Sequence, residues 1–289
     1  VLGMYQPDTV KVIRQNGVDY IVTANEGDAK TWGEDYFDDE SIFTTLTEVK
    51  LNNTNGVENS GKSEVALNPP TDTNYGFGGR SYSVWNARNG DLVYDSGSEM
   101  ERMIEKYLPE FFNVKDGTHI KDDVENDNLD NRSGKKGPEP ESIASGVSAA
   151  GDHLLFVGIE RTSVIGIWDI NDISQPIFHS LNGYTNCNGD TMNNIDPEAI
   201  TFIAATDSPT NTDLLIASGS VSNTLTVYEL VCSSSPAYLG KKQEPGCPGF
   251  VDLPETTCAS QDDSGAPGIS VSISSAILLA SFALLLGDA

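Results

Sequence analysis

A diverged repeat constrains the fold of this chain more than any other feature of its sequence. Proline, an acid, a small residue and a β-branched residue recur in that order at Pro7-Asp8-Thr9-Val10, Pro140-Glu141-Ser142-Ile143 and Pro197-Glu198-Ala199-Ile200. Each copy is followed by a strand, a turn and a second strand, and further strands follow at residues 163–170 and 224–230. The 57 residues from Pro140 to Pro197 suit one four-stranded propeller blade with a loop insertion. The repeat therefore predicts an all-β fold of the propeller type.

The longer interval between the first two copies predicts an insertion. It covers 133 residues, from Pro7 to Pro140, and we place the inserted segment at about residues 96–136. Before it, residues 82–86 and 92–95 predict a hairpin around Asn89-Gly90. Residues 98–112 form the clear helix candidate, with Ser98 and Glu101 at the spacing of a capping box and Pro109 at its end. Three to four such units cannot close a larger ring, so residues 1–231 are predicted to be part of a propeller.

The charge balance excludes several classes of partner. The chain has 43 acidic against 17 basic residues, a formal net charge of −26, and is still 38% hydrophobic. It is too apolar for a disordered acidic tail and too acidic to bind nucleic acid. Residues 56–63 satisfy the phosphate-loop pattern, but Pro69 and Pro70 leave no room for the helix that this pattern needs after its lysine. We therefore expect neither a nucleic acid nor a nucleotide as a partner.

The C-terminal part differs in composition from the rest of the chain. Residues 232–264 are rich in Cys, Pro and Ser and predict a stalk, and residues 265–289 end in an apolar run. This part resembles a lipid-anchor attachment signal, which has small residues, then a polar spacer and then an apolar run. The small residues begin at Ser264, which is the predicted attachment site. A single membrane-spanning helix and a buried C-terminal helix are the two alternatives.

The cysteines and the glycosylation sequons favour the same compartment. The disulfide candidates are Cys187, Cys232, Cys247 and Cys258, whose connectivity the spacing leaves open. Asn52 and Asn131 each begin an Asn-x-Ser/Thr triplet and are candidate glycosylation sites. Together with the tail, these features predict a protein that is lipid-anchored at the extracellular face of the cell membrane, or secreted.

Carboxylates near the repeat are the candidate metal ligands. Glu139 and Glu141 flank Pro140, which we expect to keep the segment extended so that both side chains point to one side. Glu26 and Glu160 end equivalent second strands, where they should converge. Hard oxygen ligands of this kind are those that calcium prefers. The predicted set is Glu26, Asp28, Asp127, Asp130, Glu139, Glu141 and Glu160. The alternative for the loop acids is that they cap turns in solvent.

Several of these segments resemble one known family. The motifs are Gly3–Asp8, Thr23–Asp28, Gly78–Trp85, Asn131–Ser133 with Lys136–Glu141, and Gly158–Arg161. They are similar to the choice-of-anchor I domain family, which includes the mesenchyme-specific cell-surface glycoproteins of biomineralising animals. The resemblance runs from Gly3 to about Leu230. It implies a seven-bladed propeller, of which this chain would hold the C-terminal three to four blades, followed by a C-terminal hydrophobic segment.

The resemblance also implies a function. It suggests an extracellular, membrane-anchored acidic glycoprotein that binds Ca²⁺ and takes part in biomineralisation or matrix organisation. Its partners would be calcium mineral or extracellular matrix, and the membrane through the C-terminal tail. The alternative is a calcium-dependent phosphoesterase of alkaline phosphatase or phytase-like type, for which the sequence assigns no catalytic residue. We favour the non-enzymatic interpretation.

Overall fold

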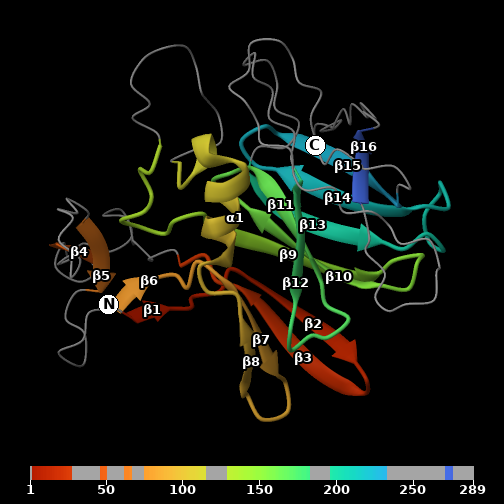
Figure 1. Cartoon of the computed structure of the whole chain (residues 1–289), viewed down its shortest axis with the longest axis horizontal. Helices are drawn as coiled ribbons and strands as arrows, with labels where there is room; N and C mark the ends of the chain where they lie inside the picture. The colour runs from red at the N-terminus through yellow and green to blue at the C-terminus, as the bar shows by residue number, and fades with distance from the viewer. Residues whose placement is uncertain are drawn as a thin grey trace, which may run out of the picture.

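The computed structural model describes residues 2–27, 46–50, 62–66, 75–114, 129–182, 196–232 and 271–275. Within these ranges the chain forms four sheets of four strands each and one α-helix (Figure 1). Nearly all strand pairs are antiparallel, the exception being the parallel pair of β1 and β6. The predicted all-β class is confirmed.

Three of the sheets are meanders in which each strand pairs with the next one of the sheet. They have the orders β2-β3-β7-β8, β9-β10-β11-β12 and β13-β14-β15-β16, and the fourth sheet has the order β1-β6-β5-β4. The strands are β1 (Leu2–Met4), β2 (Thr9–Gln15), β3 (Val18–Ala24), β4 (Leu46–Lys50), β5 (Lys62–Ala66), β6 (Tyr75–Phe77), β7 (Tyr82–Asn86), β8 (Leu92–Asp95), β9 (Pro140–Val147), β10 (His153–Ile159), β11 (Val164–Asp169), β12 (Ile177–Asn182), β13 (Pro197–Ile203), β14 (Asp213–Gly219), β15 (Thr224–Cys232) and β16 (Val271–Ser275).

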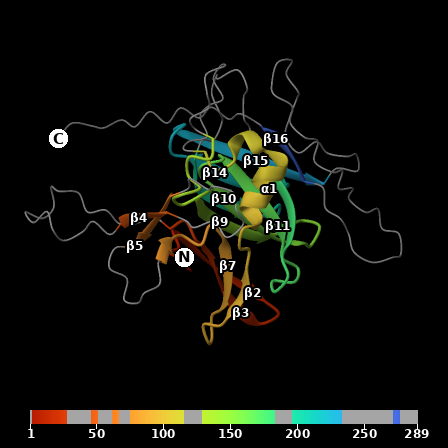
Figure 2. The same ribbon diagram turned by 60° about the vertical axis from the view of Figure 1, so that its left-hand side comes forward.

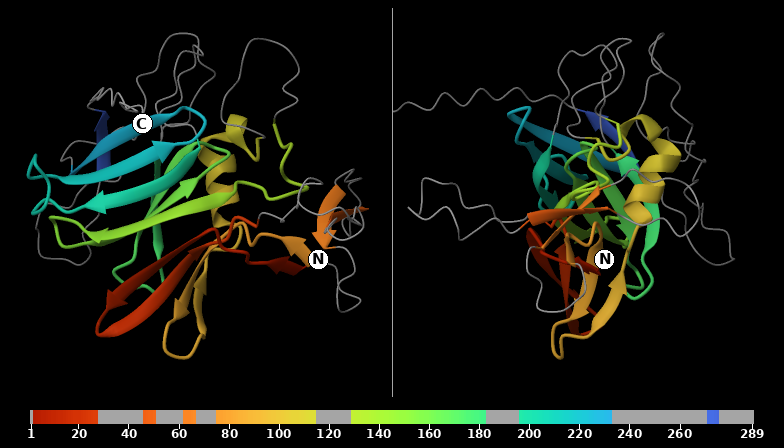
Figure 3. Two further views of the ribbon diagram at one scale, coloured as in Figure 1. Left: turned by 180° about the vertical axis from the view of Figure 1, so that it is seen from behind. Right: turned by 90° about the vertical axis from the view of Figure 1, so that its left-hand side faces the viewer.

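Each copy of the repeat opens a separate meander. β9 and β13 begin at the repeated prolines Pro140 and Pro197, and β2 begins two residues after Pro7. These first strands are neighbours, because β9 contacts both β2 and β13. The three meanders therefore follow one another in space, as the views from behind and from the side show (Figure 3).

Two apolar layers hold the meanders together. The first contains Val22 and Tyr82 of the first meander together with Leu155 and Trp168 of the second. The second lies between the second and third meanders, where Phe156 stacks on Phe202 with ring centroids 5.7 Å apart. Each sheet is thus buried against its neighbour, which is why the strands of the second meander are apolar on both faces.

The predicted helix forms, but with different ends. Helix α1 covers Glu99–Tyr107, and the 3-10 turn η2 (Pro109–Phe111) follows it (Figure 2). The capping box does not form, since the Ser98 hydroxyl accepts a hydrogen bond from Arg102 and Glu101 accepts one from Arg80 instead. Met100 and Ile104 of α1 are fully buried in the first apolar layer. The helix therefore covers the junction between the first and second meanders.

The positions of the strands bear on three further predictions. The predicted hairpin is β7–β8, but only Gly90 of the Asn89-Gly90 pair has a positive φ, so its turn is not type I′. Lys62 begins strand β5, so no helix starts at the lysine of the phosphate-loop pattern. In the C-terminal tail, residues 271–275 form strand β16 and pair with β15, where the spanning alternative would place a helix.

Other predictions fall on residues that the structure does not describe. They concern Asn52, Asp28, Asp127, Ser264, Cys187, Cys247 and Cys258, and most of the predicted stalk and tail. Cys232 ends β15, but its side chain is outside the description. In the described ranges, no helix is long and apolar enough to cross a membrane.

The buried Gln15 side chain yields a test of the packing between the first two meanders. Its amide donates to the Ile170 carbonyl at 2.8 Å and its oxygen accepts from the Ile173 amide at 3.3 Å. Gln15→Ala leaves both backbone groups without these partners, so we expect a loss of about 1–3 kcal/mol in unfolding free energy, measured with urea. Arg14→Ala is the matched control, because the Arg14–Asp19 ion pair is 70% and 50% exposed and should matter by less than about 1 kcal/mol. Equal losses in the two variants would contradict this account.

Candidate functional site

The residue before each repeated proline has an unusual backbone conformation. Gln6, Glu139 and Asp196 have φ angles of 39°, 55° and 57°. Their carbonyl oxygens accept hydrogen bonds from Gly27, Glu160 and Ser220, respectively, at the ends of the second strands. The prediction that Pro140 keeps Glu139 extended is therefore wrong, because this backbone bond holds the residue in the left-handed region. Such positions cost energy in a residue with a side chain, and they often occur at functional sites.

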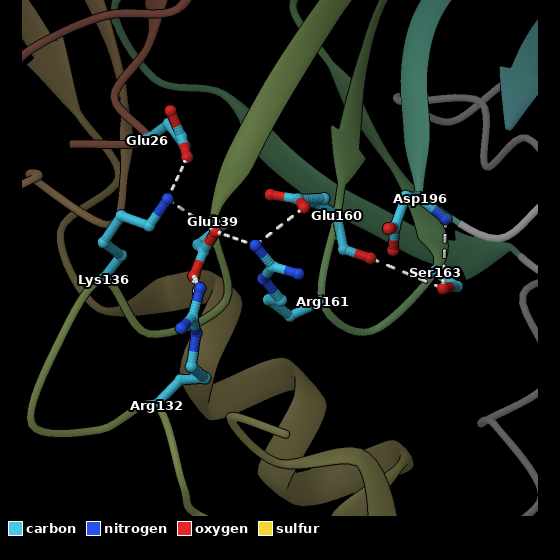
Figure 4. A network of polar contacts seen from close by, with 8 residues as sticks. All are labelled: Glu26, Arg132, Lys136, Glu139, Glu160, Arg161, Ser163 and Asp196. Atoms are coloured by element: carbon cyan, nitrogen blue, oxygen red, sulfur yellow. Dashed lines mark hydrogen bonds and ion pairs between the residues drawn. The ribbon is translucent and has the colours of Figure 1, made fainter. Parts of the chain in front are cut away.

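The Glu139 carboxylate is the centre of a buried ion-pair network (Figure 4). It is 0% exposed. Arg132 reaches its Oε1 atom at 2.6 Å, while Lys136 and Arg161 reach its Oε2 atom at 3.0 and 2.9 Å. A buried carboxylate is stable only when such partners replace the water that it has lost. The three bases keep Glu139 ionised.

Two further carboxylates share these bases. Lys136 contacts Glu26 Oε1 at 2.5 Å, and Arg161 contacts Glu160 Oε1 at 2.9 Å. Glu26 follows β3 of the first meander, whereas Glu160 follows β10 of the second. One oxygen each of Glu26, Glu139 and Glu160 lies within 4.8 Å of the others. We call these three residues the carboxylate cluster.

The network extends to the third meander. The Ser163 hydroxyl donates to the Glu160 carbonyl at 3.4 Å and accepts from the Asp196 amide at 3.3 Å. Burial acts to lower the pKa of Arg161, but its hydrogen bond to Glu139 and the charges of Glu139, Glu160 and, least of these, Asp196 raise it. The cluster thus lies where the ends of all three meanders meet.

Arg80 fixes the loop that supplies two of the bases. Its guanidinium donates to the carbonyls of Ser133 and Lys135 at 2.6 and 2.7 Å, and to Glu101 at 3.1 Å. Gly137, with a φ of 68°, lies against the Arg80 side chain, where a Cβ atom would come within 2.9 Å of Cδ. The loop therefore packs around one arginine, and this packing presents Arg132 and Lys136 to Glu139.

Glycines position Glu26 on the opposite side. Gly27 and Gly78 have φ angles of 84° and 79°, and a Cβ atom on Gly27 would lie only 1.9 Å from the Gly78 Cα atom. Only glycine permits this approach of the two backbones. The contact brings residues 26–27 against residues 77–78 and directs the end of β3 toward the cluster.

Burial and pairing give the carboxyl groups in and beside the cluster different pKa values. Burial alone would raise the pKa of Glu139, but hydrogen bonding from Arg161 and the charge of Lys136 lower it to about 2. Burial and the hydrogen bond to Glu139 raise the pKa of Glu160 to about 10. Burial also raises the pKa of Glu141 to about 7, with the charges of Glu198, Glu26 and Asp8 adding to the rise. In the absence of a metal ion, Glu160 carries the proton that the cluster needs.

The described members of the predicted ligand set do not all come together. Glu26, Glu139 and Glu160 come together in the cluster, and Glu141 lies next to Glu160, to which it is hydrogen-bonded. Asp130 stands apart, because it is exposed and accepts a hydrogen bond from the Ser133 hydroxyl in a turn. Asn131, the described sequon asparagine, is also exposed.

Sequence reasoning missed the bases. Arg132, Lys136 and Arg161 lie inside the motifs that carried the family resemblance, but only the acids of those motifs were considered as site residues. Basic residues are scarce in this chain, which has 17 of them against 43 acids. The presence of three basic residues close to the repeat could therefore have indicated their role. A buried acid needs such partners, and the nearest bases in the motifs are these three.

Comparison with known proteins identifies the family. Residues 1–173 match the model of the choice-of-anchor I domain, which is more than half of the 289 residues. The chain belongs to the choice-of-anchor I domain family. The match includes the first meander, strands β9 to β11 of the second and the whole carboxylate cluster, and it ends before β12 begins at Ile177. The recognition made from the motifs is confirmed.

Two curated proteins are similar to this family member. Gigasin-3a of Magallana gigas is 30% identical over 172 residues, which are 55% of this chain and 58% of that protein. The mesenchyme-specific cell surface glycoprotein of Strongylocentrotus purpuratus is 34% identical over 114 residues, 36% of this chain and 14% of that protein. The chain therefore spans only part of the length of the curated relatives. No solved structure matches it.

Removing the central charge should destabilise the fold. Glu139→Gln leaves three buried or half-buried bases without their shared carboxylate, and breaking a buried ion pair costs about 3–5 kcal/mol. We expect a loss of this size in unfolding free energy from urea titration. Asp19→Asn breaks the exposed pair with Arg14 and is the control, with an expected change below about 1 kcal/mol. A Glu139→Gln protein as stable as the control would show that the network does not hold the meanders together.

The protonated Glu160 predicts a pH dependence of stability in metal-free protein. Because its folded-state pKa lies near 10, the unfolded chain binds fewer protons above about pH 5, and stability should fall as the pH rises toward 9. Glu160→Gln mimics the protonated side chain, so this fall should be shallower in the variant. Urea titrations between pH 5 and 9 with a chelator measure the two slopes. Identical slopes would mean that Glu160 is ionised in the folded protein.

Proposed function

We propose that this choice-of-anchor I protein is an extracellular, membrane-anchored acidic glycoprotein that binds calcium and takes part in biomineralisation or matrix organisation. The observation that carries the proposal is the carboxylate cluster, in which Glu26, Glu139 and Glu160 bring three oxygens within 4.8 Å of one another. Calcium takes six to eight oxygen ligands in flexible geometry, and carboxylates are the commonest of them.

The arrangement of charge supports a cation at this place. Among the described residues, Glu26, Glu139 and Glu160 share the bases Arg132, Lys136 and Arg161, and Glu141 adds a further acid beside Glu160. The Lys136 ammonium already lies between Glu26 and Glu139, at 2.5 and 3.0 Å. An ion that binds both carboxylates takes the place of this ammonium, which lies on a long flexible side chain and can turn away. Lys136 would then be a competitor of calcium.

The location at the cell surface rests on the relatives and on the sequence. One relative is named a cell surface glycoprotein, and the exposure of Asn131 suits a glycosylation site. Anchoring at Ser264, glycosylation at Asn52 and the four cysteines as disulfides remain predictions, as do Asp28, Asp127 and Asp130 as further ligands. The mineral or matrix partner and the attachment to a membrane through the tail also remain predictions.

We also propose that the three meanders are consecutive blades of a propeller. Ile143 and Ile200, at equivalent positions of the repeat, pack against the preceding meander, whereas the equivalent Val10 of the first meander is 55% exposed. In the second and third meanders, the face that carries the equivalent isoleucine is buried against the meander before it. The corresponding face of the first meander, around Val10, is uncovered. This supports a preceding blade of the same kind, as in a ring of seven.

The phosphoesterase alternative has less support. Arg132, Lys136 and Arg161 could hold a phosphate, but each already pairs with Glu139. Hydrolysis of a chromogenic phosphate ester by the full chain, with calcium or with chelator, separates the two functions. We expect no calcium-dependent release of product. Turnover that depends on calcium would favour the enzyme.

Calcium should stabilise the folded protein. An ion held by the cluster binds the folded state alone and adds about 2.7 kcal/mol at a hundredfold excess over its Kd. We expect calcium to raise the melting temperature of the full chain, and Glu26→Gln with Glu160→Gln to remove most of that rise. These two residues are chosen because Glu139 is needed for the fold.

A matched pair of substitutions provides the control. Glu105→Gln with Asp207→Asn changes two exposed acids that lie outside the carboxylate cluster. That variant should keep the rise in melting temperature, measured as the difference with and without calcium. A calcium response that survives Glu26→Gln with Glu160→Gln would contradict the assignment of the ion to the cluster.

A further inference from the structure

The three meanders stack in one repeating way, with the front face of one against the back face of the one before. The front face carries the residues three and five positions after the repeated proline, and the back face carries those two and four positions after it. Ile143 and Ile200, on the front faces, both pack against the preceding meander. On the back face of the second meander, Ala144 pairs with Phe156 and Phe156 with Ile167, and all three are buried in the layer shared with the third meander. Each junction therefore buries one front face and one back face.

The first meander leaves its front face open. Val10 is three positions after Pro7 and Val12 is five, and Val12 is 61% exposed. The isoleucines at the position of Val10 in the other two meanders are covered. Strand pairing continues from Val12 through Ile21 and Trp85 to Leu92, which is exposed as well. The front face is thus an apolar strip across the four strands of this meander.

The third meander leaves its back face open. Thr201 pairs with Ile216 and Ile216 with Val227, so these residues have the positions that are buried in the second meander. Thr201 is exposed, whereas Ile216 and Val227 are half-buried. Leu225 is 68% exposed, but Ile165, at the same position of the second meander, is only 1% exposed. The side chains that a following meander would cover are therefore in contact with solvent.

The two open faces lie at opposite ends of the stack (Figure 3). Together they are the two halves of the junction that the chain already forms twice, between its first and second and between its second and third meanders. Exposed apolar faces of this kind mark sites of contact with other proteins. One copy cannot bring the two faces together, because they belong to the outer sides of its first and last meanders.

We propose that the front face of the first meander binds the back face of the third meander of a second copy of this chain. The proposal rests on the propeller-type stacking proposed above, and it names the partner that supplies the preceding blade. Because the two faces differ, the contact is heterologous, and copies join head to tail into a closed ring or an open chain. The net charge of −26 opposes this contact at low salt, and added salt screens the repulsion.

Sedimentation velocity of the full chain over a range of protein concentrations, in high salt, tests the contact. We expect the native chain to associate as its concentration rises. Val12→Asp and Leu225→Asp each place an unpaired charge in the apolar contact, and each should weaken the association at least about tenfold. Ile177→Asp is the matched control, because Ile177 is exposed on β12 of the second meander, outside both open faces, and this variant should associate like the native chain.

A mixture of the two variants tests the head-to-tail arrangement. The Val12→Asp chain keeps an intact back face, and the Leu225→Asp chain keeps an intact front face. We expect the mixture to form one-to-one dimers that grow no further, because the faces left over carry the introduced charges. This result also shows that both variants are folded. Self-association of either variant alone at the native strength would overturn the arrangement.

The remaining outcomes separate this inference from the proposed function. A native chain that stays monomeric at every concentration overturns the contact between copies. Association that neither Asp substitution weakens overturns it as well, because the contact would then use another surface, such as the apolar C-terminal run. The calcium response is independent, since Val12 and Leu225 lie outside the carboxylate cluster. A monomeric chain that calcium stabilises would support the proposed function alone, and an associating chain without a calcium response would support this inference alone.

Discussion

The pairing of one buried carboxylate with three bases organises this end of the molecule. Glu139 has no exposed surface, and Arg132, Lys136 and Arg161 approach it within 2.6–3.0 Å. Two of these bases also hold Glu26 and Glu160, so the first and second meanders are linked through a single side chain. The loop that carries Arg132 and Lys136 is packed around Arg80, and this support lets the network stay buried. The apolar layers bring the sheets together, and the ion pairs fix how their ends meet.

Much of the fold could be predicted because residues close together in the sequence determine where the strands of the repeat begin. The recurring proline and acid mark the first strand of each meander, and the helix follows from the spacing of Met100, Ile104 and Tyr107. The convergence of Glu26 and Glu160 followed from their equivalent places after second strands. What failed depended on contacts distant in sequence. Glu139 is left-handed where its carbonyl accepts from the Glu160 amide, and the Glu101 side chain does not return to Ser98 because it binds Arg80.

The three copies of the repeat are alike in backbone but not in chemistry. Before the proline they have Gln6, Glu139 and Asp196, and at the end of the second strand Glu26, Glu160 and Ser220. Only the second copy has a Glu at both places, and only there do the bases gather. After the proline all three copies have an acid, namely Asp8, Glu141 and Glu198. The chemistry of the cluster therefore belongs to the second copy and its neighbours, whereas the backbone conformation before the proline is common to all three.

A crystal structure of the full chain grown with calcium, with anomalous scattering used to locate the ions, tests this account most directly. It predicts an ion at the meeting point of the three meanders, bound by carboxylates from at least two of them, with Arg132 and Arg161 still on Glu139. Ions scattered over the acidic surface, with Lys136 still between Glu26 and Glu139, would contradict it.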